Sequence, residues 1–370
     1  LQKRYQSRKK QQVMQKRDAN KKKGPKPQAL PNDEEASARS VAIAVPSDER
    51  EQLMEEIMEK RKIELIEFLG HGSYGEVRKG KMEDGTLVAI KCQGDIAEGI
   101  KLEAEVIEEV QKRKPKYFLK LYDSERGSDK LHFFVMSLVG PTIAELMKCQ
   151  DGYHFSITTA VRIMMFILYQ LKSLHEAGYL HLDIKLDNMA IGHPDGKTEP
   201  RAVYLLDFGC ARRYLEKDPK TNKLKYRRPK RSIKRRGNKK YQSANALMNY
   251  DVSPADDLIS FSYVLTQLVE WIMPWNDTLP MEELIRIKEH VTGDDLFIDN
   301  APELGPMYDY IRTIKYNEQP DYVKIYKFLK ASLRKNKGRF SYPYDWEEEG
   351  QFKELAKPFT DADFVANPFA

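Results

Sequence analysis

The apolar residues of this 370-residue chain change their spacing from strand-like alternation in its first part to helix-like repeats in its second. Alternation interrupted by a glycine-rich turn predicts a strand–turn–strand over 63–77. Short apolar runs predict further strands at 87–92 and 131–138, with a helix at 100–110 between them. A helical lead-in is predicted over 47–61, where apolar residues recur at helical spacing. The first part is therefore expected to be rich in strands.

The second part is predicted to be mainly helical. A long apolar helix is expected over 158–174, and a buried helix over 254–271 begins with a proline and two aspartates, a common pattern at a helix start. Two more helices are predicted at 281–290 and 322–333, and a short strand at 202–206. A strand-rich part followed by a helix-rich part predicts an α+β, two-lobed fold with a cleft between the lobes.

The composition of both ends predicts tails around one folded domain. Residues 1–46 are rich in Lys, Arg and Gln and poor in large apolar side chains, which predicts disorder. The folded domain is expected at 62–347, divided into a smaller lobe at 62–138 and a larger lobe at 139–347. Residues 348–370 are expected to form a C-terminal tail.

The net charge of +6 hides an uneven distribution. Residues 1–30 carry a net +10 and residues 210–240 a net +13, which leaves −17 for the remainder. Basic blocks of this kind attract acidic partners. A solvated basic loop is the alternative interpretation of the second block, and nucleic-acid binding is disfavoured because few aromatic residues are interleaved with it.

Three cysteines, Cys92, Cys149 and Cys210, lie far apart and form no Cys-x-x-Cys pair. Neither a disulfide framework nor a zinc site is therefore predicted, and a reducing compartment is expected, cytoplasmic or alternatively nuclear. No apolar run is expected to approach the roughly 20 residues that span a bilayer, so no membrane association is predicted. The chain begins with Leu1 and a basic stretch, which predicts no signal peptide and an upstream segment.

A glycine-rich motif lies in the first predicted hairpin. Glycines at this spacing let a hairpin backbone approach a polyphosphate without side-chain clash. Alone, the motif is weak evidence, because an ordinary turn or a dinucleotide-binding fingerprint has similar spacing; the fingerprint needs a helix next, whereas 77–81 is predicted to be a strand. The candidate nucleotide-binding residues of this motif are Leu69, Gly70, His71, Gly72, Ser73, Tyr74, Gly75, Glu76 and Val77.

Lys91 lies at the end of the next apolar strand, where its ammonium group would point into the site and hold the α- and β-phosphates. The helix that follows offers Glu103 as the ion-pair partner that would orient Lys91. Glu103 shares a helical face with Val106 and Val110, so it should point inward. Glu105 lies off that face and is the weaker alternative. A solvated lysine and a solvated glutamate are the structural alternatives to this pair.

The run from His181 to Asn188 directly follows the long apolar helix. Asp183 is placed to accept the proton of a substrate hydroxyl or to orient that hydroxyl. Lys185 can neutralise charge on a transferring phosphoryl group, and Asn188 can coordinate magnesium. His181 is predicted to pack the loop, and Asp187 to be solvated or to cap a turn.

Asp207 ends another apolar strand and is followed by Phe208 and Gly209. A carboxylate there can ligate a magnesium ion that bridges nucleotide phosphates. An Asp-Phe-Gly tripeptide alone often marks only a turn. The four motifs together, in this order, supply the parts that phosphoryl transfer needs: a phosphate cover, a paired lysine, an acid that orients the acceptor, and two metal ligands.

With these motifs the sequence resembles the eukaryotic protein kinase family from about residue 58 to 347 and, within it, the casein kinase 1 group. Ser243-Ala244-Asn245 matches the S-x-N form that this group has where most kinases have Ala-Pro-Glu. The run 227–243 looks closest to the tau-tubulin kinase branch. The resemblance also implies a hinge that faces adenine, with Met136 as gatekeeper, followed by Ser137 and Val139.

The resemblance implies a serine/threonine kinase that uses ATP and Mg²⁺ on protein substrates, with a preference for acidic or already phosphorylated segments. We expect a monomer. The basic block gives an independent reason for that preference, because clustered Lys and Arg near a cleft attract anionic segments. The residues expected to form the substrate anion site are Arg227, Arg228, Lys230 and Arg231.

Two of the departures from the family pattern bear on activity. Leu182 replaces the arginine that commonly clamps a phosphorylated activation loop, which favours a kinase that is active without loop phosphorylation. Asn238 replaces a threonine that usually bonds the catalytic aspartate and lysine, which puts catalytic efficiency in doubt. A catalytically weak pseudokinase that binds ATP and scaffolds partners is therefore the alternative function.

Overall fold

The computed structural model describes residues 47–72, 75–93, 98–125, 131–150, 154–229, 237–276 and 278–348. The predicted disorder of 1–46 and the predicted tail after 348 lie outside these residues. So do four predicted site residues, Ser73, Tyr74, Lys230 and Arg231.

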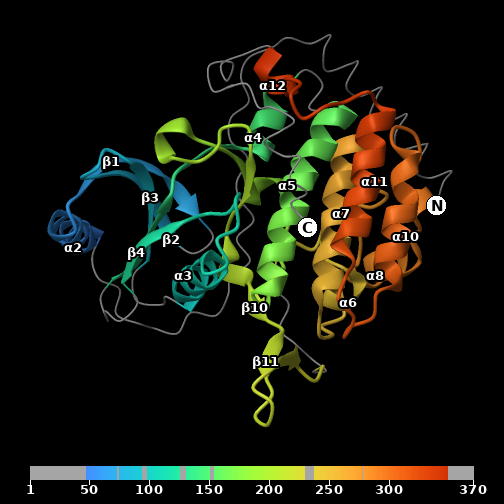
Figure 1. Cartoon of the computed structure of the whole chain (residues 1–370), viewed down its shortest axis with the longest axis horizontal. Helices are drawn as coiled ribbons and strands as arrows, with labels where there is room; N and C mark the ends of the chain where they lie inside the picture. The colour runs from blue at the N-terminus through green and yellow to red at the C-terminus, as the bar shows by residue number, and fades with distance from the viewer. Residues whose placement is uncertain are drawn as a thin grey trace.

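The N-terminal part is a five-stranded antiparallel sheet with strand order β1-β2-β3-β5-β4, flanked by two helices (Figure 1). Because side chains alternate across a strand, Val88 and Ile90 of β3 pack with Met58 of α2, whereas Ala89 joins the cluster that contains α3. One helix therefore covers each face of the sheet. The elements are α2 (Ser47–Lys60), β1 (Ile63–Gly72), β2 (Gly75–Met82), β3 (Leu87–Gln93), α3 (Glu98–Gln111), β4 (Leu121–Glu125) and β5 (His132–Ser137).

The C-terminal part is mainly helical and is built around α5 and α7 (Figure 1). The α7 helix begins with a capping box, in which Ser253 and Asp256 satisfy each other's backbone amides. Its helices are α4 (Ile143–Lys148), α5 (Ile157–Glu176), α6 (Ala244–Leu247), α7 (Pro254–Glu270), α8 (Met281–His290), α9 (Gly293–Leu296), α10 (Gly305–Thr313), α11 (Tyr322–Lys335) and α12 (Asp345–Glu348). The two-lobed architecture predicted from the hydrophobic pattern is thus present.

Short strands at the junction of the two lobes carry the loops of the candidate site. One sheet has the order β6-β8-β9, and β7 pairs with β10 in another. A hairpin of β11 and β12 projects away from the body (Figure 1). The strands are β6 (Val139–Thr142), β7 (Tyr179–Leu180), β8 (Met189–Gly192), β9 (Val203–Leu205), β10 (Arg212–Arg213), β11 (Leu215–Lys217) and β12 (Leu224–Tyr226).

The expectation that no apolar run approaches bilayer length was wrong for α5. This helix has 20 residues and a mean hydropathy of 1.2, so its length and composition would allow it to cross a membrane. However, 78% of the 18-residue stretch of α5 to which this hydropathy applies is buried inside the protein. The apolarity of α5 is accounted for by its place at the centre of the helical part.

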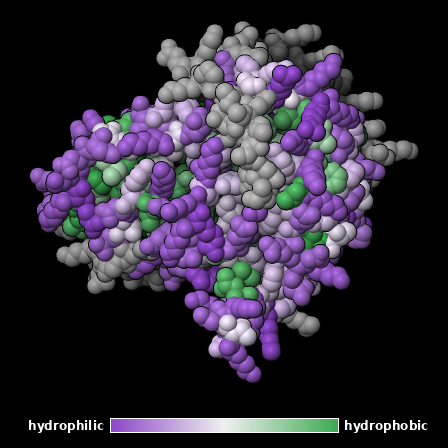
Figure 2. Space-filling view, viewed as in Figure 1, coloured by the Kyte–Doolittle hydropathy of each residue, from purple (hydrophilic) through white to green (hydrophobic). Residues whose placement is uncertain are grey.

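The surface is mostly hydrophilic on the face that Figure 2 shows, with isolated apolar side chains. Single exposed apolar residues are normal on the surface of a folded protein. The large apolar residues that are exposed among the described residues are Ile66, Phe68, Leu69, Leu224, Tyr250, Trp271 and Tyr342.

Candidate active site

The glycine-rich motif is the tight hairpin between β1 and β2. Gly70, His71 and Gly72 lie in β1 and pair with Val77, Glu76 and Gly75 of β2. Gly75 has a φ of +142°, and a Cβ there would lie 2.1 Å from the carbonyl oxygen of Cys92. Only glycine fits so close to β3. This close approach keeps the hairpin next to the strand that carries Lys91.

Lys91 joins two carboxylates from different elements. Its Nζ donates to Glu103 Oε2 at 2.6 Å and lies 3.8 Å from Asp207 Oδ1. The predicted ion pair between Lys91 and Glu103 is therefore present, and both side chains are buried. Burial alone would lower the pKa of the Lys91 ammonium, but the negative charges of Glu103 and Asp207 reverse this effect and raise it. Lys91 thus carries its positive charge at neutral pH.

Asp183 receives hydrogen bonds from three different groups. Lys185 Nζ lies 2.8 Å from Asp183 Oδ2, and Asn188 Nδ2 donates to the same oxygen at 3.1 Å. The backbone amide of Asn238 donates to Oδ1 at 2.9 Å. Gly237 makes this approach sterically accessible, because its φ is +86° and a Cβ there would lie 2.1 Å from the Leu182 carbonyl oxygen. The carboxylate is therefore fixed in orientation by positive and dipolar groups.

The side chain of Asn238 does not take the place of the missing threonine hydroxyl. Its Oδ1 accepts from the backbone amide of Lys240 at 2.9 Å, and its contact with Asp183 is made by the backbone amide. The structure thus keeps one hydrogen bond to Asp183 from this position and directs the amide side chain into the local turn.

Asn188 and Asp207 lie at neighbouring ends of the paired strands β8 and β9. The amide of Leu206 donates to the carbonyl of Asn188 at 2.9 Å, which ties the two chain segments together. Asp207 has a left-handed backbone with a φ of +62°, and its Oδ1 accepts from the Gly209 amide at 3.3 Å. The next residue, Phe208, is fully buried. The two predicted metal ligands are thus carried by adjacent chain segments.

A buried hydrogen-bond network at His181 and Leu182 contains Asp257, a residue whose role the sequence did not reveal. Asp257 Oδ2 accepts from the His181 amide at 2.7 Å and from His175 Nε2 at 2.9 Å, and Oδ1 accepts from the Leu182 amide at 2.9 Å. Leu182 has a φ of +68°, a conformation that costs energy for a branched side chain. The hydrogen bond from the Leu182 amide to Asp257 stabilises this backbone conformation. The sequence had marked Asp257 only as one of two aspartates at the start of the helix predicted over 254–271.

The other predicted nucleotide-binding residues lie on β5 and β6. Met136 and Ser137 end β5 and are buried, and Val139 begins β6 and is partly buried. The Ser137 side chain accepts from the Lys120 amide at 3.0 Å, which ties the end of β5 to the residue before β4. Leu69 in β1 is 47% exposed.

Two of the predicted anion-site residues are described. Arg227 is partly buried, and its Nη2 lies 4.0 Å from Asp251 Oδ1, which also pairs with Arg212 at 3.0 Å. The Nε and Nη2 atoms of Arg227 are shielded from solvent and have no hydrogen-bond partner among the described residues. Arg228 is exposed. Two guanidinium groups therefore share one carboxylate.

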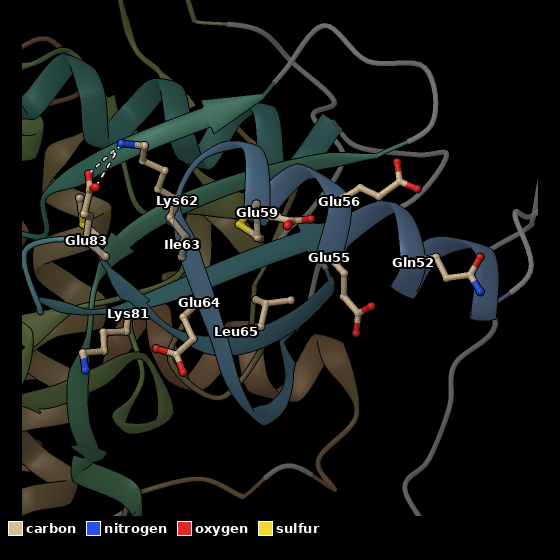
Figure 3. A pocket seen from close by; sticks show the side chains of 12 residues that line it. Gln52, Glu55, Glu56, Glu59, Lys62, Ile63, Glu64, Leu65, Lys81 and Glu83 are labelled. Atoms are coloured by element: carbon tan, nitrogen blue, oxygen red, sulfur yellow. Dashed lines mark hydrogen bonds and ion pairs between the residues drawn. The ribbon is translucent and has the colours of Figure 1, made fainter.

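A surface groove of about 880 Å³ lies away from these residues, between α2 and the β1–β2 strands (Figure 3). Its lining is mainly acidic, and Figure 3 shows Lys62 paired with Glu83 at its edge. None of the residues predicted to bind nucleotide, metal or substrate lines it.

Residues 63–336 match the model of the protein kinase domain. This match covers most of the chain and coincides with the two lobes and the buried Lys91–Glu103 pair. The chain therefore belongs to the protein kinase family.

Curated relatives place it more narrowly. The chain is 28% identical over 312 residues to a serine/threonine-protein kinase of Caenorhabditis elegans, with 82% of this chain and 88% of that protein aligned. It is 27% identical to casein kinase I homolog 3 of Saccharomyces cerevisiae (60% of this chain, 46% of that protein) and to casein kinase I homolog 2 of Schizosaccharomyces pombe (75% and 64%). The likeness supports a casein kinase 1-like serine/threonine kinase. The tau-tubulin kinase branch stays a prediction.

Proposed function

We propose that the protein transfers the γ-phosphate of ATP to serine and threonine hydroxyls of protein substrates. The observation that carries this proposal is the convergence of Lys185, Asn188 and the Asn238 amide on Asp183, next to the buried Lys91–Glu103 pair. These groups are the parts that phosphoryl transfer requires, held by contacts that need no substrate.

In the proposed reaction, Asp183 orients the acceptor hydroxyl and receives its proton. The acceptor oxygen forms a bond to the γ-phosphorus while the bond from that phosphorus to the β–γ bridging oxygen breaks, and ADP leaves. Lys185, which pairs with Asp183 Oδ2, is placed to balance charge on the transferring group. Lys91 is held charged and aimed by Glu103, which suits it to the α- and β-phosphates.

The residues present fit a magnesium ion. Asn188 and Asp207 offer an amide oxygen and a carboxylate, and Mg²⁺ prefers oxygen ligands and is often completed by substrate phosphates. Within the described ranges, no group of three or more His, Cys, Asp or Glu side chains could hold a metal. The proposed ion would therefore depend on the nucleotide for its remaining ligands. When bound, it would neutralise the charge of the phosphates.

The test is transfer of labelled γ-phosphate from Mg-ATP to serine and threonine peptides, comparing wild type with Lys91→Met. The substitution should lower transfer by about 100-fold or more, because it removes a buried phosphate-binding charge. Phosphoamino-acid analysis should find phosphoserine or phosphothreonine. Measurable Mg-ATP binding without any transfer by wild type would instead favour the pseudokinase scaffold, for which Leu182 and Asn238 were the sequence evidence.

We further propose that the substrates are acidic or already phosphorylated. Arg212 and Arg227 place two positive charges around Asp251, and Arg228 is exposed beside them. Guanidinium groups bind carboxylate and phosphate well, and two nitrogen atoms of Arg227, although shielded from solvent, have no hydrogen-bond partner among the described residues. A cytoplasmic or nuclear location, a monomeric state and the tau-tubulin kinase branch remain predictions of the sequence.

Arg227→Gln is expected to raise KM for a phosphoserine-containing peptide about tenfold, since a hydrogen bond between charged groups contributes about 1.5–3 kcal/mol. KM for a neutral peptide should change little. Lys217→Gln is the matched control, because it removes one positive charge from the same chain segment at an exposed position. Equal effects of both substitutions on both peptides would contradict a specific anion site.

A further inference from the structure

A second glutamate of α3 forms a contact that crosses from the N-terminal to the C-terminal lobe. Glu105 Oε1 accepts a hydrogen bond from the Tyr179 hydroxyl at 2.6 Å and lies 3.2 Å from Arg213 Nη2. Arg213 also donates to the Tyr179 hydroxyl, and its guanidinium carbon lies 4.9 Å from the centre of the Tyr179 ring. Figure 1 shows α3 beside β10 at this point. Three side chains thus connect three elements.

Glu105 acts on a different side of α3 from Glu103. Residues two positions apart on an α-helix point in nearly opposite directions. Glu103 points to Lys91 in the sheet, whereas Glu105 points to β7 and β10. Contacts on two sides of α3 fix both the rotation of the helix about its own axis and its distance from the neighbouring elements. A movement of α3 that breaks the Glu105 contact therefore also displaces Glu103.

The C-terminal side of this contact is rigid. Tyr179 and Arg213 are directly opposite each other in the antiparallel pair of β7 and β10. Tyr179 is 1% exposed, and burial together with the Glu105 hydrogen bond raises the pKa of its hydroxyl to about 12. The neighbouring Arg212 is paired with the buried carboxylate of Asp251. The Tyr179 hydroxyl is therefore held in place for Glu105, whereas the ion pair of Arg213 with Glu105 lies at the surface, with side chains 53% and 50% exposed.

The chain segment after Asp207 is held in place although position 182 is a leucine and not the arginine that commonly binds a phosphate on this segment. Leu182 packs against a buried cluster of Leu180, Tyr214 and Val252. An apolar side chain there cannot bind a phosphate. The backbone pairing of β10 with β7 and the Arg212–Asp251 ion pair anchor this segment instead. The arrangement that places Glu103 on Lys91 is thus built from unmodified residues.

We propose that Glu105, Tyr179 and Arg213 form an interlobe latch that holds α3 in the position where Glu103 orients Lys91, with Glu105 as a positioning residue. With this latch, α3 and Glu103 take the position that orients Lys91 without phosphorylation of the chain. It rests on the proposed kinase function for its effect on rate, but its effect on the position of α3 can be measured without any transfer.

The first experiment compares Glu105→Gln and Tyr179→Phe with wild type and with Glu109→Gln. Glu109 lies on the same helix, and its hydrogen bond and ion pairs are with Lys112 and Arg113, which directly follow α3 in the chain. Each latch substitution should lower kcat/KM for ATP about 5- to 10-fold, with KM for the peptide and the melting temperature nearly unchanged. Glu109→Gln should stay within about twofold of wild type.

The second experiment exchanges the charges. Arg213→Glu alone places two carboxylates together and should lower kcat/KM more than Glu105→Gln does, whereas Glu105→Arg combined with Arg213→Glu should recover activity to within about threefold of wild type. A double variant no better than the worse single variant would overturn the latch. So would a Glu105→Gln protein with wild-type kcat/KM, or one whose loss only follows its melting temperature.

Amide hydrogen exchange separates this proposal from the proposed function. The latch predicts faster exchange in α3 of the Glu105→Gln protein than in wild type or Glu109→Gln, whether or not any of them transfers phosphate. Unchanged exchange in α3 would overturn the latch even in an active kinase. Faster exchange in α3 of the Glu105→Gln protein, together with a wild type that transfers no phosphate, would support the latch and reject only the proposed function.

Discussion

Asp183→Asn is expected to lower kcat by about 10²- to 10⁴-fold while Mg-ATP still binds within a few-fold of wild type. An amide cannot accept the hydroxyl proton. Its NH₂ group would also face donors, because Lys185, Asn188 and the Asn238 amide all donate to the carboxylate. The substitution changes almost no volume, so the loss should appear in the chemical step. Single-turnover transfer from bound labelled ATP measures it directly.

Asp187→Asn is the control for this prediction. Asp187 belongs to the same loop but is exposed, so its replacement should leave kcat within about twofold. If Asp183→Asn instead retained more than a tenth of the wild-type kcat in a folded protein, Asp183 would not be the group that orients the acceptor. The proposed mechanism would then fail, although Lys91 could still bind nucleotide.

Asp257→Asn is expected to lower the free energy of unfolding by about 3 kcal/mol, the largest stability effect predicted for a volume-conserving change here. His181, Leu182 and His175 all donate to this buried carboxylate. Asparagine offers one acceptor oxygen and turns an NH₂ toward a donor, so a buried hydrogen bond is lost and replaced by repulsion. Urea unfolding followed by fluorescence measures the difference.

The same residue makes stability depend on pH. Burial alone would raise the pKa of Asp257, but the hydrogen bond from His175 and the surrounding positive charge and amide dipoles reverse this effect, and its folded-state pKa lies below the ordinary value of 3.8. Its contribution is therefore present above about pH 4 and is lost as the pH falls through the lowered pKa. The wild-type and Asp257→Asn stabilities should converge in acid. Parallel curves down to pH 2 would contradict this assignment.

Local patterns in the sequence predicted the longest helices and most strands of the N-terminal sheet. The helix at 281–290 was predicted with its observed bounds, and those at 158–174 and 322–333 to within two residues at each end. The helix α10 was missed although its buried residues recur at helical spacing, and the other missed helices and the strands at the junction of the lobes are only a few residues long. Of the other missed strands, β4 is partly buried throughout, and the hairpin of β11 and β12 carries mostly exposed charged residues. The hairpin follows Gly209 closely, where the sequence showed only a basic block.

The candidate site could be predicted only in part. Apolar periodicity ranked Glu103 above Glu105 as the partner of Lys91, and the structure has that pair. The same periodicity described Glu105 only as a residue off the buried face, because its partners Tyr179 and Arg213 lie 74 and 108 positions away. Asp257 was visible only as an acid at a helix start, although it holds a loop 76 positions earlier.

The sequence alone thus determined the order of the four motifs, the alternation of strands and helices, and the chemistry that each motif can support. These properties depend on backbone preferences and on side-chain spacing within a few residues, which neighbouring positions encode. The tertiary structure decided which charges meet: Lys91 with Glu103, Asp257 with the loop at His181, and Glu105 with Tyr179 and Arg213. Such pairs depend on how whole elements pack around the buried core, and no local spacing specifies that geometry.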